Sequence, residues 1–208
     1  LSSGAAVEAN IDASQFEAAR GAHTGNPGKK ADLGTRSDRE KQYTVAELLA
    51  MGFEHIQWDG VTPIPIVDCC GRIIAVLAGQ PGGDYPEELQ EAFGIMLKEG
   101  ENAGLSSKAA DGPHKRGAFP AYNRGVTMGM GNARLVVLNL KSMTQVLNHL
   151  VGHSAFRRMA RYQNAAFGLW APRVYEEYEK VHNTIHSNLE LPVNFPGVVF
   201  TAAAFNFG

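Results

Sequence analysis

The chain has 208 residues, of which 44% are hydrophobic, enough for one domain with a substantial core. Its formal net charge of −2 excludes a global basic field, so any nucleic-acid contact must come from a local patch. No apolar run approaches the roughly 18 residues of a membrane span, and no membrane association is predicted. The only cysteines, Cys69 and Cys70, are adjacent and cannot form an ordinary framework disulfide, which favours a reducing, intracellular compartment.

The N-terminal stretch, residues 1–42, has few large apolar side chains and is predicted to be a flexible arm. The first firm element follows Thr44, which has with Glu47 the spacing of a capping box at a helix N-terminus. Gly52 is expected to end this short helix. The folded part is therefore predicted to span residues 43–208.

A β-hairpin and a helix come next. Residues 63–67 and 72–77 are rich in β-forming side chains, and the four residues between them close with Gly71, which predicts a turn. Pro86 favours the first turn of a helix, and acidic residues near it favour the same end electrostatically. This helix is predicted to run to about Lys98 and to end at Gly100.

Residues 102–132 are interrupted by glycine and proline, and a loop of this length inside a compact domain is more often functional than filler. Residues 134–140 then predict a buried strand. Asparagine and arginine suit base edges and phosphates, so the basic and amide side chains in this loop and just after it predict nucleic-acid contact. They are Lys115, Arg116, Arg124, Asn132 and Arg134. The alternative is that Arg134 only pairs with an acidic residue.

Three helices are predicted after this strand. The first begins at a capping box formed by Ser142 and Gln145 and ends at Gly152. The second runs from Ser154 to Gly168, and the third begins at Pro172.

The second of these helices carries Arg157, Arg158 and Arg161 within about one and a half turns. Such a cluster can bind phosphates, but it can equally be an ordinary solvated face. The sequence leaves both interpretations open.

Two histidine pairs have suggestive spacings. His182 and His186 lie one helical turn apart, as in metal sites, but the glutamate of the HExxH motif is missing and no third ligand is evident, so a solvated helix face is preferred. His149 and His153 flank the break at Gly152, where they are expected to cap a helix C-terminus.

The last segment, residues 198–207, is apolar at almost every position and predicts a strand buried on both faces. Alternation along a strand places Ala202, Ala204 and Asn206 on one face and the larger Phe205 and Phe207 on the other. Because the sequence stops at Gly208, directly after this strand, the partner strands are expected to lie outside it. The predicted class is α+β.

Several runs match a known family when they are taken together. They are Trp58-Asp59-Gly60 with Thr62-Pro63, residues 71–79, residues 125–132, Trp170-Ala171-Pro172, Asn194-Phe195-Pro196 and Phe205-Asn206-Phe207-Gly208. In order and spacing they resemble the fungal branch of the TET/JBP family of iron- and 2-oxoglutarate-dependent nucleic-acid base oxygenases. The resemblance covers about residues 58–208, and each run is weak on its own.

The resemblance implies a double-stranded β-helix, or jelly-roll, preceded and interrupted by helices, of which residues 43–208 would be the first half. In that family, Phe-Asn-Phe-Gly leads into an HxD motif, and a second histidine follows to complete the 2-His-1-carboxylate facial triad. Fe(II) and 2-oxoglutarate are therefore expected to be bound mainly by residues beyond Gly208. No catalytic residue and no metal ligand is assigned within this chain.

What this half would contribute, by resemblance, is the base pocket and the DNA-facing surface. Ala204 matches a small residue beside the methyl group of the flipped base, and Asn132 falls near an asparagine that holds that base. Residues assigned to substrate binding are Asn132, Ala204, Arg134, Gly129 and Gly131. Those assigned to the DNA backbone are Arg124, Lys115, Arg116, Arg157, Arg158 and Arg161.

The expected function is oxidation of methylated bases in double-stranded DNA, chiefly 5-methylcytosine and with N6-methyladenine as a further substrate left open, by an oxygenase that flips the base out of the duplex. The expected partners are methylated DNA and the remaining half of the catalytic domain, for a monomeric, nuclear protein. The alternative is a non-catalytic DNA-binding relative that has lost the metal site. A structural fragment without a function of its own is a third possibility.

Overall fold

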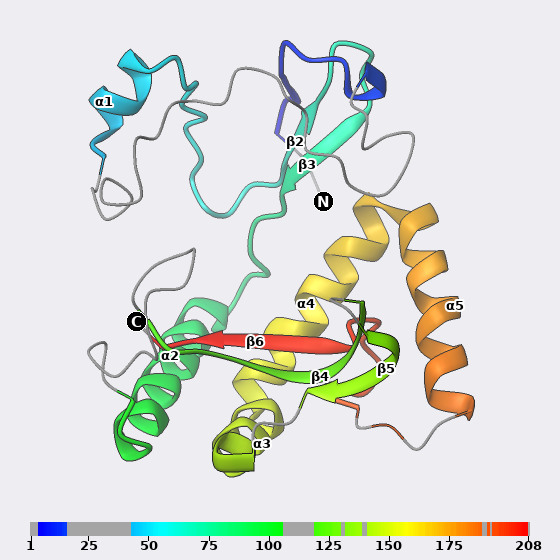
Figure 1. Ribbon diagram of the computed structural model, residues 1–208. Coiled ribbons are helices and arrows are strands. Elements are labelled where there is room, and N and C mark those ends of the chain that lie inside the picture. The colour runs from blue at the N-terminus through cyan, green and yellow to red at the C-terminus, as the bar shows by residue number, and fades with distance from the viewer. Residues whose placement is uncertain are drawn as a thin grey trace. The chain divides into compact units, whose positions relative to one another are not determined.

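The computed structural model describes residues 4–15, 43–105, 119–129, 132–138, 141–188, 191 and 193–207. The chain divides into two compact units, Leu1–Pro81 and Gly82–Gly208, each with one small sheet (Figure 1). Within the described residues, five α-helices and two three-stranded sheets confirm the predicted mixture of α and β structure. None of the helices in these ranges has the length and apolar character needed to cross a membrane.

The first unit is built around the predicted hairpin. Strand β2 (Ile64–Val67) pairs antiparallel with β3 (Ile73–Leu77), as expected. Strand β1 (Val7–Glu8) pairs parallel with β2 and precedes a 3-10 turn, Ala13–Gln15. Residues 4–15, predicted to belong to a flexible arm, therefore supply a strand instead; residues 16–42 lie outside the described part of the chain.

Two local motifs of this unit follow their sequence. Helix α1 (Val45–Ala50) begins at the predicted capping box, in which Thr44 Oγ1 accepts from the Glu47 N–H at 3.2 Å and the Glu47 carboxylate accepts from the Thr44 N–H at 2.8 Å. Gly52 follows with φ +90°, as a helix stop requires.

A tight loop joins two of the runs on which the family resemblance rests. Asp59 accepts from the Thr62 N–H at 2.7 Å, and Trp58 Nε1 donates to the Thr62 carbonyl at 2.7 Å. A Cβ on Gly79 would lie 2.1 Å from the Val61 carbonyl oxygen, so only glycine permits this approach. These residues therefore have structural roles in closing the loop.

The second unit contains the remaining elements and the hydrophobic core. All fully buried apolar residues among those described belong to this unit. The helices are α2 (Tyr85–Asn102), α3 (Thr144–Gly152), α4 (Ser154–Trp170) and α5 (Pro172–Asn188). The strands are β4 (Ala121–Gly129), β5 (Asn132–Leu138) and β6 (Ala202–Asn206), in the antiparallel order β5-β4-β6.

Strand β4 lies where the sequence predicted part of a long loop. Gly125 and Gly129 interrupt its pattern of strand-forming residues, which hides the strand from a search for alternation. Residues 106–118 of the predicted loop are outside the described ranges. The expected strand at 134–140 is present as β5, but it is an edge strand with Val136 37% exposed, so the prediction of full burial is wrong.

Helix α2 does not end at Gly100. This glycine lies within the helix and is buried, and a Cβ there would come 2.8 Å from Cδ1 of Phe207. The absent side chain lets the Phe207 ring pack against the helix. Gly100 is therefore a packing residue, and its predicted role as a helix stop is wrong.

The starts of α3 and α4 also differ from expectation. Residues Lys141–Met143 form a 3-10 turn and Met143 precedes α3, so Ser142 forms no capping box. His153 accepts from the Ala155 N–H through its side chain at 3.3 Å and so caps the N-terminus of α4. His153 is also the C-cap residue of α3, as expected, because its backbone N–H donates to the Leu150 carbonyl at 3.2 Å. Helix α4 continues past Gly168 to Trp170.

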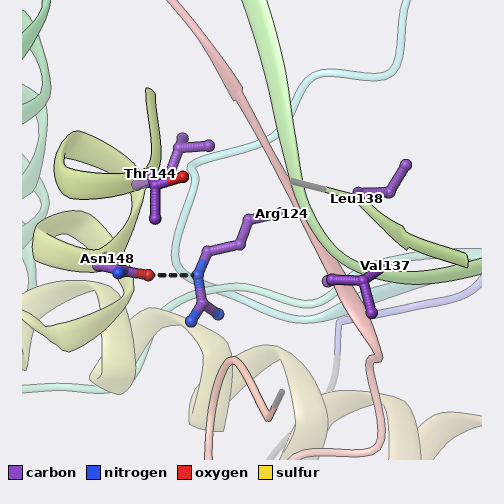
Figure 2. A pocket seen from close by; sticks show the side chains of 7 residues that line it. Arg124, Val137, Leu138, Thr144 and Asn148 are labelled. Carbon is purple, nitrogen blue, oxygen red and sulfur yellow. Dashed lines mark hydrogen bonds between the residues drawn. The ribbon is translucent and has the colours of Figure 1, made fainter. Parts of the chain in front are cut away.

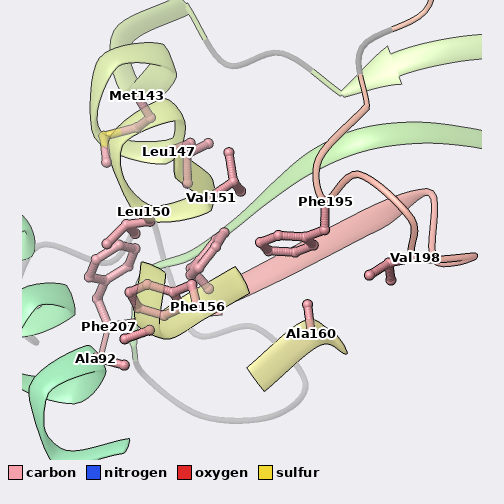
Figure 3. Packing of buried hydrophobic residues seen from close by; sticks show 12 residues of the cluster. Ala92, Met143, Leu147, Leu150, Val151, Phe156, Ala160, Phe195, Val198 and Phe207 are labelled. Atoms are coloured by element: carbon pink, nitrogen blue, oxygen red, sulfur yellow. The ribbon is translucent and has the colours of Figure 1, made fainter. Parts of the chain in front are cut away.

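The core brings one face of β6 against the helices (Figure 3). Phe205 and Phe207 are 5% and 4% exposed, and the Phe205 ring meets Phe156 of α4 edge to face at 5.6 Å. Ala202, Ala204 and Asn206 are exposed on the other face. The predicted alternation is confirmed, but burial on both faces is wrong.

Candidate functional site

The exposed face of β4 and β6 places a small side chain between two amides. Ala204 pairs with Asn123 across the strands, and Asn206 follows two residues along β6 on the same face. All three are exposed. Directly opposite residues in such a pair have Cβ atoms about 4.5–5.5 Å apart. We call this group, Asn123, Ala204 and Asn206, the open face.

The open face is held in position by a close approach at Gly125. This glycine has φ +132°, and a Cβ there would lie 2.2 Å from the Thr201 carbonyl oxygen and 2.6 Å from Cα of Ala202. The Asn194 amide nitrogen would be 2.7 Å away. Glycine is thus required where the chain enters β6.

Asn194 joins these segments with a buried side chain. It is 5% exposed, and its Nδ2 donates to the Arg124 carbonyl at 2.8 Å and to the Thr201 carbonyl at 3.3 Å. Its Oδ1 accepts from Nη1 of Arg124. Three runs of the family resemblance, at Gly125, at Asn194 and in β6, therefore meet at one place.

Arg124 occupies the opposite, packed face of β4. Its Nε donates to Oδ1 of Asn148 at 2.9 Å, and its Nη1 donates to Asn194. The side chain borders a pocket of about 200 Å³ that α3 closes with Thr144 and Asn148 (Figure 2). Val137 and Leu138 of β5 form the other wall.

The electrostatics of this pocket favour an anion. Burial lowers the pKa of Arg124, yet a guanidinium remains protonated at neutral pH. Among the described residues its hydrogen-bond partners are amide oxygens, and it forms no ion pair there. A phosphate or carboxylate would supply the missing countercharge. Arg124 and Ala204 lie on opposite faces of the sheet, so one small ligand does not touch both.

The three arginines of α4 differ in what surrounds them. Arg158 forms ion pairs with Asp84 and Glu88, both at 2.7 Å, and lies over the Tyr85 ring. It therefore joins α4 to the start of α2. Arg157 and Arg161 are exposed and have no ion pair among the described residues, so a phosphate contact remains open for these two alone.

The register separates two residues that were predicted to share a base pocket. Asn132 pairs with Gly129, six residues along β4 from the Asn123 that pairs with Ala204. At about 3.3 Å per residue this is roughly 20 Å. Strand β5 also contains Arg134, but the side chains of Asn132 and Arg134, and all of Lys115, Arg116 and Gly131, lie outside the described residues. Asn123, which no sequence signal indicated, takes the place beside Ala204.

The metal-ligating residues of the described part do not fit a facial triad. The rings of His182 and His186 are 4.4 Å apart, and no described carboxylate completes a set of three ligands with them. Burial, and to a smaller extent the charge of His186, lowers the pKa of His182. The group that does gather three potential ligands is Asp12 with Cys69 and Cys70, both cysteines being exposed. Neither set is the 2-His-1-carboxylate arrangement of a non-haem iron oxygenase.

Comparisons of the chain with family models, with curated proteins and with solved structures found no match.

Proposed function

We propose that this chain is the substrate-binding part of a TET/JBP-type oxygenase with a jelly-roll core, acting on methylated bases in DNA, with the flipped base lying against the open face. The observation that carries the proposal is the juxtaposition of Ala204 with Asn123 and Asn206. A small side chain leaves room for a methyl group, and the flanking amides can donate to and accept from the edge of a base.

The motifs give further support. Gly125, Asn194 and β6 were noted as separate runs of the family resemblance, and they converge through the Asn194 hydrogen bonds and the close approach at Gly125. Such spatial convergence is expected when the separate runs belong to one fold that a family shares.

The proposed role of this chain is to bind and present the base. Fe(II) and 2-oxoglutarate, which the resemblance implies, do not fit the ligand groups of the described residues, so these residues are given no part in the oxidation step. Flipping a base costs a few kcal/mol, and phosphate contacts by Arg124, Arg157 or Arg161 would offset part of it.

The test compares two duplexes that differ only in one 5-methylcytosine. Fluorescence anisotropy with the 208-residue chain should give tighter binding to the methylated duplex. Ala204→Val should reduce this preference, because the added methyl groups occupy the space that the methyl group of the base would take, and misfit of about one methylene can cost on the order of 1–3 kcal/mol. Ala165→Val, on an exposed position of α4, is the matched control.

Two outcomes would contradict the proposal. Equal affinity for both duplexes would remove recognition of the methyl group. An equal effect of Ala204→Val and Ala165→Val would remove the open face from the site. Tight, methyl-selective binding by a complete assembly that never oxidises the base would favour the alternative, a non-catalytic DNA-binding relative.

A further inference from the structure

The outer edge of β6 has backbone groups that pair with no strand among the described residues. Strand β4 lies on one side of β6, and the described residues place no strand on the other. Phe207 N–H donates to the Pro120 carbonyl at 2.8 Å and Val126 N–H to the Thr201 carbonyl at 3.0 Å, which sets the hydrogen-bonded pairs of the ladder. The residues between those pairs direct N–H and C=O away from β4: Ala202, Ala204 and Asn206.

An apolar trough follows the same edge. One pocket of about 420 Å³ lies between β6 and α4, where Phe156, Met159 and Ala160 form a stripe at helical spacing. A second pocket, of about 450 Å³, lies between α5 and the segment that enters β6. Phe200 and Ala202 line both, so the two pockets adjoin each other along the start of β6.

We propose that this edge and trough dock an extended segment of another polypeptide, which adds to β6 as a fourth strand and places apolar side chains in the trough. Outward N–H and C=O groups at every second residue match an extended backbone, whereas a helix or a small apolar molecule would leave them unpaired. Every second side chain of an added strand faces the trough, at intervals of about 6.5–7 Å.

The undescribed segments of these 208 residues and a second copy of β6 fit the trough poorly. Residues 16–42 and 106–118, which lie outside the described ranges, contain no run of alternating large apolar residues. A second copy of β6 offers little to fill the trough, because its own Phe205 and Phe207 are already 5% and 4% exposed under its helices. The occupant is therefore a strand with free apolar side chains on one face. This inference is independent of the proposed DNA chemistry.

The probe is a fluorescein-labelled peptide with valine and phenylalanine at alternate positions, threonine between them and lysine at both ends. Two further peptides have the same sequence with alternate backbone amides N-methylated, one in each phase. The unmodified peptide should bind the 208-residue chain, and methylation in one phase should abolish binding because it removes the donors that face β6. Hydrogen exchange at the Ala204 amide should slow when the peptide is bound.

Two protein variants separate the trough from general charge effects. Met159→Lys places an ammonium group in the trough and should weaken binding about tenfold or more. Ala165→Lys adds the same charge at an exposed position of the same helix and should leave binding unchanged. Thermal melts of both variants confirm that they are folded.

Four results would overturn the inference. The first is that both N-methylated peptides bind as well as the unmodified peptide. The second is that Met159→Lys and Ala165→Lys change peptide binding equally. The third is that the unmodified peptide does not bind at concentrations up to about 1 mM, where even weak complexes are populated. The fourth is a concentration-dependent dimer that Met159→Lys dissociates, which would make a second copy the occupant.

Discussion

Two glycines on helix α2 allow the packing of β6 to be tested with one substitution made twice. Gly94 is exposed and a Cβ there meets nothing within 4 Å, whereas a Cβ on Gly100 would lie 2.8 Å from Cδ1 and 3.4 Å from Cε1 of Phe207. Gly94→Ala should stabilise the protein by about 1 kcal/mol through helix propensity. Gly100→Ala gains the same propensity but overpacks a buried ring, which typically costs about 1–3 kcal/mol.

The expected difference between the two variants is therefore about 1–3 kcal/mol, and thermal denaturation should resolve it at about 3–5 °C per kcal/mol for a unit of this size. In the Gly100→Ala variant, adding Phe207→Leu should relieve most of the overpacking penalty. In the Gly94→Ala variant there is no such penalty for Phe207→Leu to relieve. If Gly100→Ala is as stabilising as Gly94→Ala, Phe207 does not pack against α2. The alternation that exposes Ala204 and Asn206 would then lose its support.

Further predictions concern the residues around the site. Asn194→Ala should destabilise the protein by about 2–4 kcal/mol in a urea titration, because three hydrogen bonds of a buried amide are lost. Asn148→Ala removes one exposed hydrogen bond and should cost about 1 kcal/mol or less in the same titration. Arg124→Gln should make the slope of log affinity against log salt concentration shallower by about one unit, because one phosphate contact is lost, and Arg124→Lys should keep the slope. Arg173→Gln is the exposed control. Equal slopes in all three variants would leave Arg124 a purely structural residue. Hydrogen bonds, chiefly those from Ser14, lower the pKa of Asp12 to about 2. The stability that this carboxylate contributes is therefore present above its ordinary pKa near 3.8 and is lost as the pH falls towards 2. Melts between pH 5 and pH 2 should therefore be less pH-dependent for Asp12→Asn than for the unmodified chain.

Local signals in the sequence predicted those elements whose residues act on their immediate neighbours. The Thr44 capping box, the hairpin turn closed by Gly71 and the start of α5 at Pro172 depend on contacts within a few residues, and each lies where it was predicted. The alternation of β6 was also visible, because a change from alanine to phenylalanine marks which face is packed.

Features set by distant contacts were missed or misinterpreted. Gly100 has the composition of a helix stop, but its role is set by a ring more than a hundred residues away in the sequence. Strand β4 contains a glycine that its partner Asn194 requires, and that glycine breaks the alternation that would have revealed the strand. His153 caps the preceding helix through its backbone N–H, as expected, but the sequence did not indicate that its side chain also caps the helix that follows.

The candidate site was predicted in part for the same reason. Ala204 was singled out, whereas its neighbour Asn123 became apparent only from the register of β4 against β6. Arg158 was grouped with Arg157 and Arg161 because the three are close in sequence, yet the acidic residues at the start of α2 engage Arg158 alone. A cluster in sequence gives no information about which member already has a partner.

The most direct test of the proposed function is whether the methylated base leaves the duplex when this chain binds. A duplex carrying 2-aminopurine beside a 5-methylcytosine reports unstacking as a rise in fluorescence. The 208-residue chain should produce that rise, Ala204→Val should reduce it sharply, and Ala165→Val should leave it unchanged. Fluorescence that stays at the level of free duplex under saturating protein would contradict the account, because a base that remains stacked cannot lie against the open face.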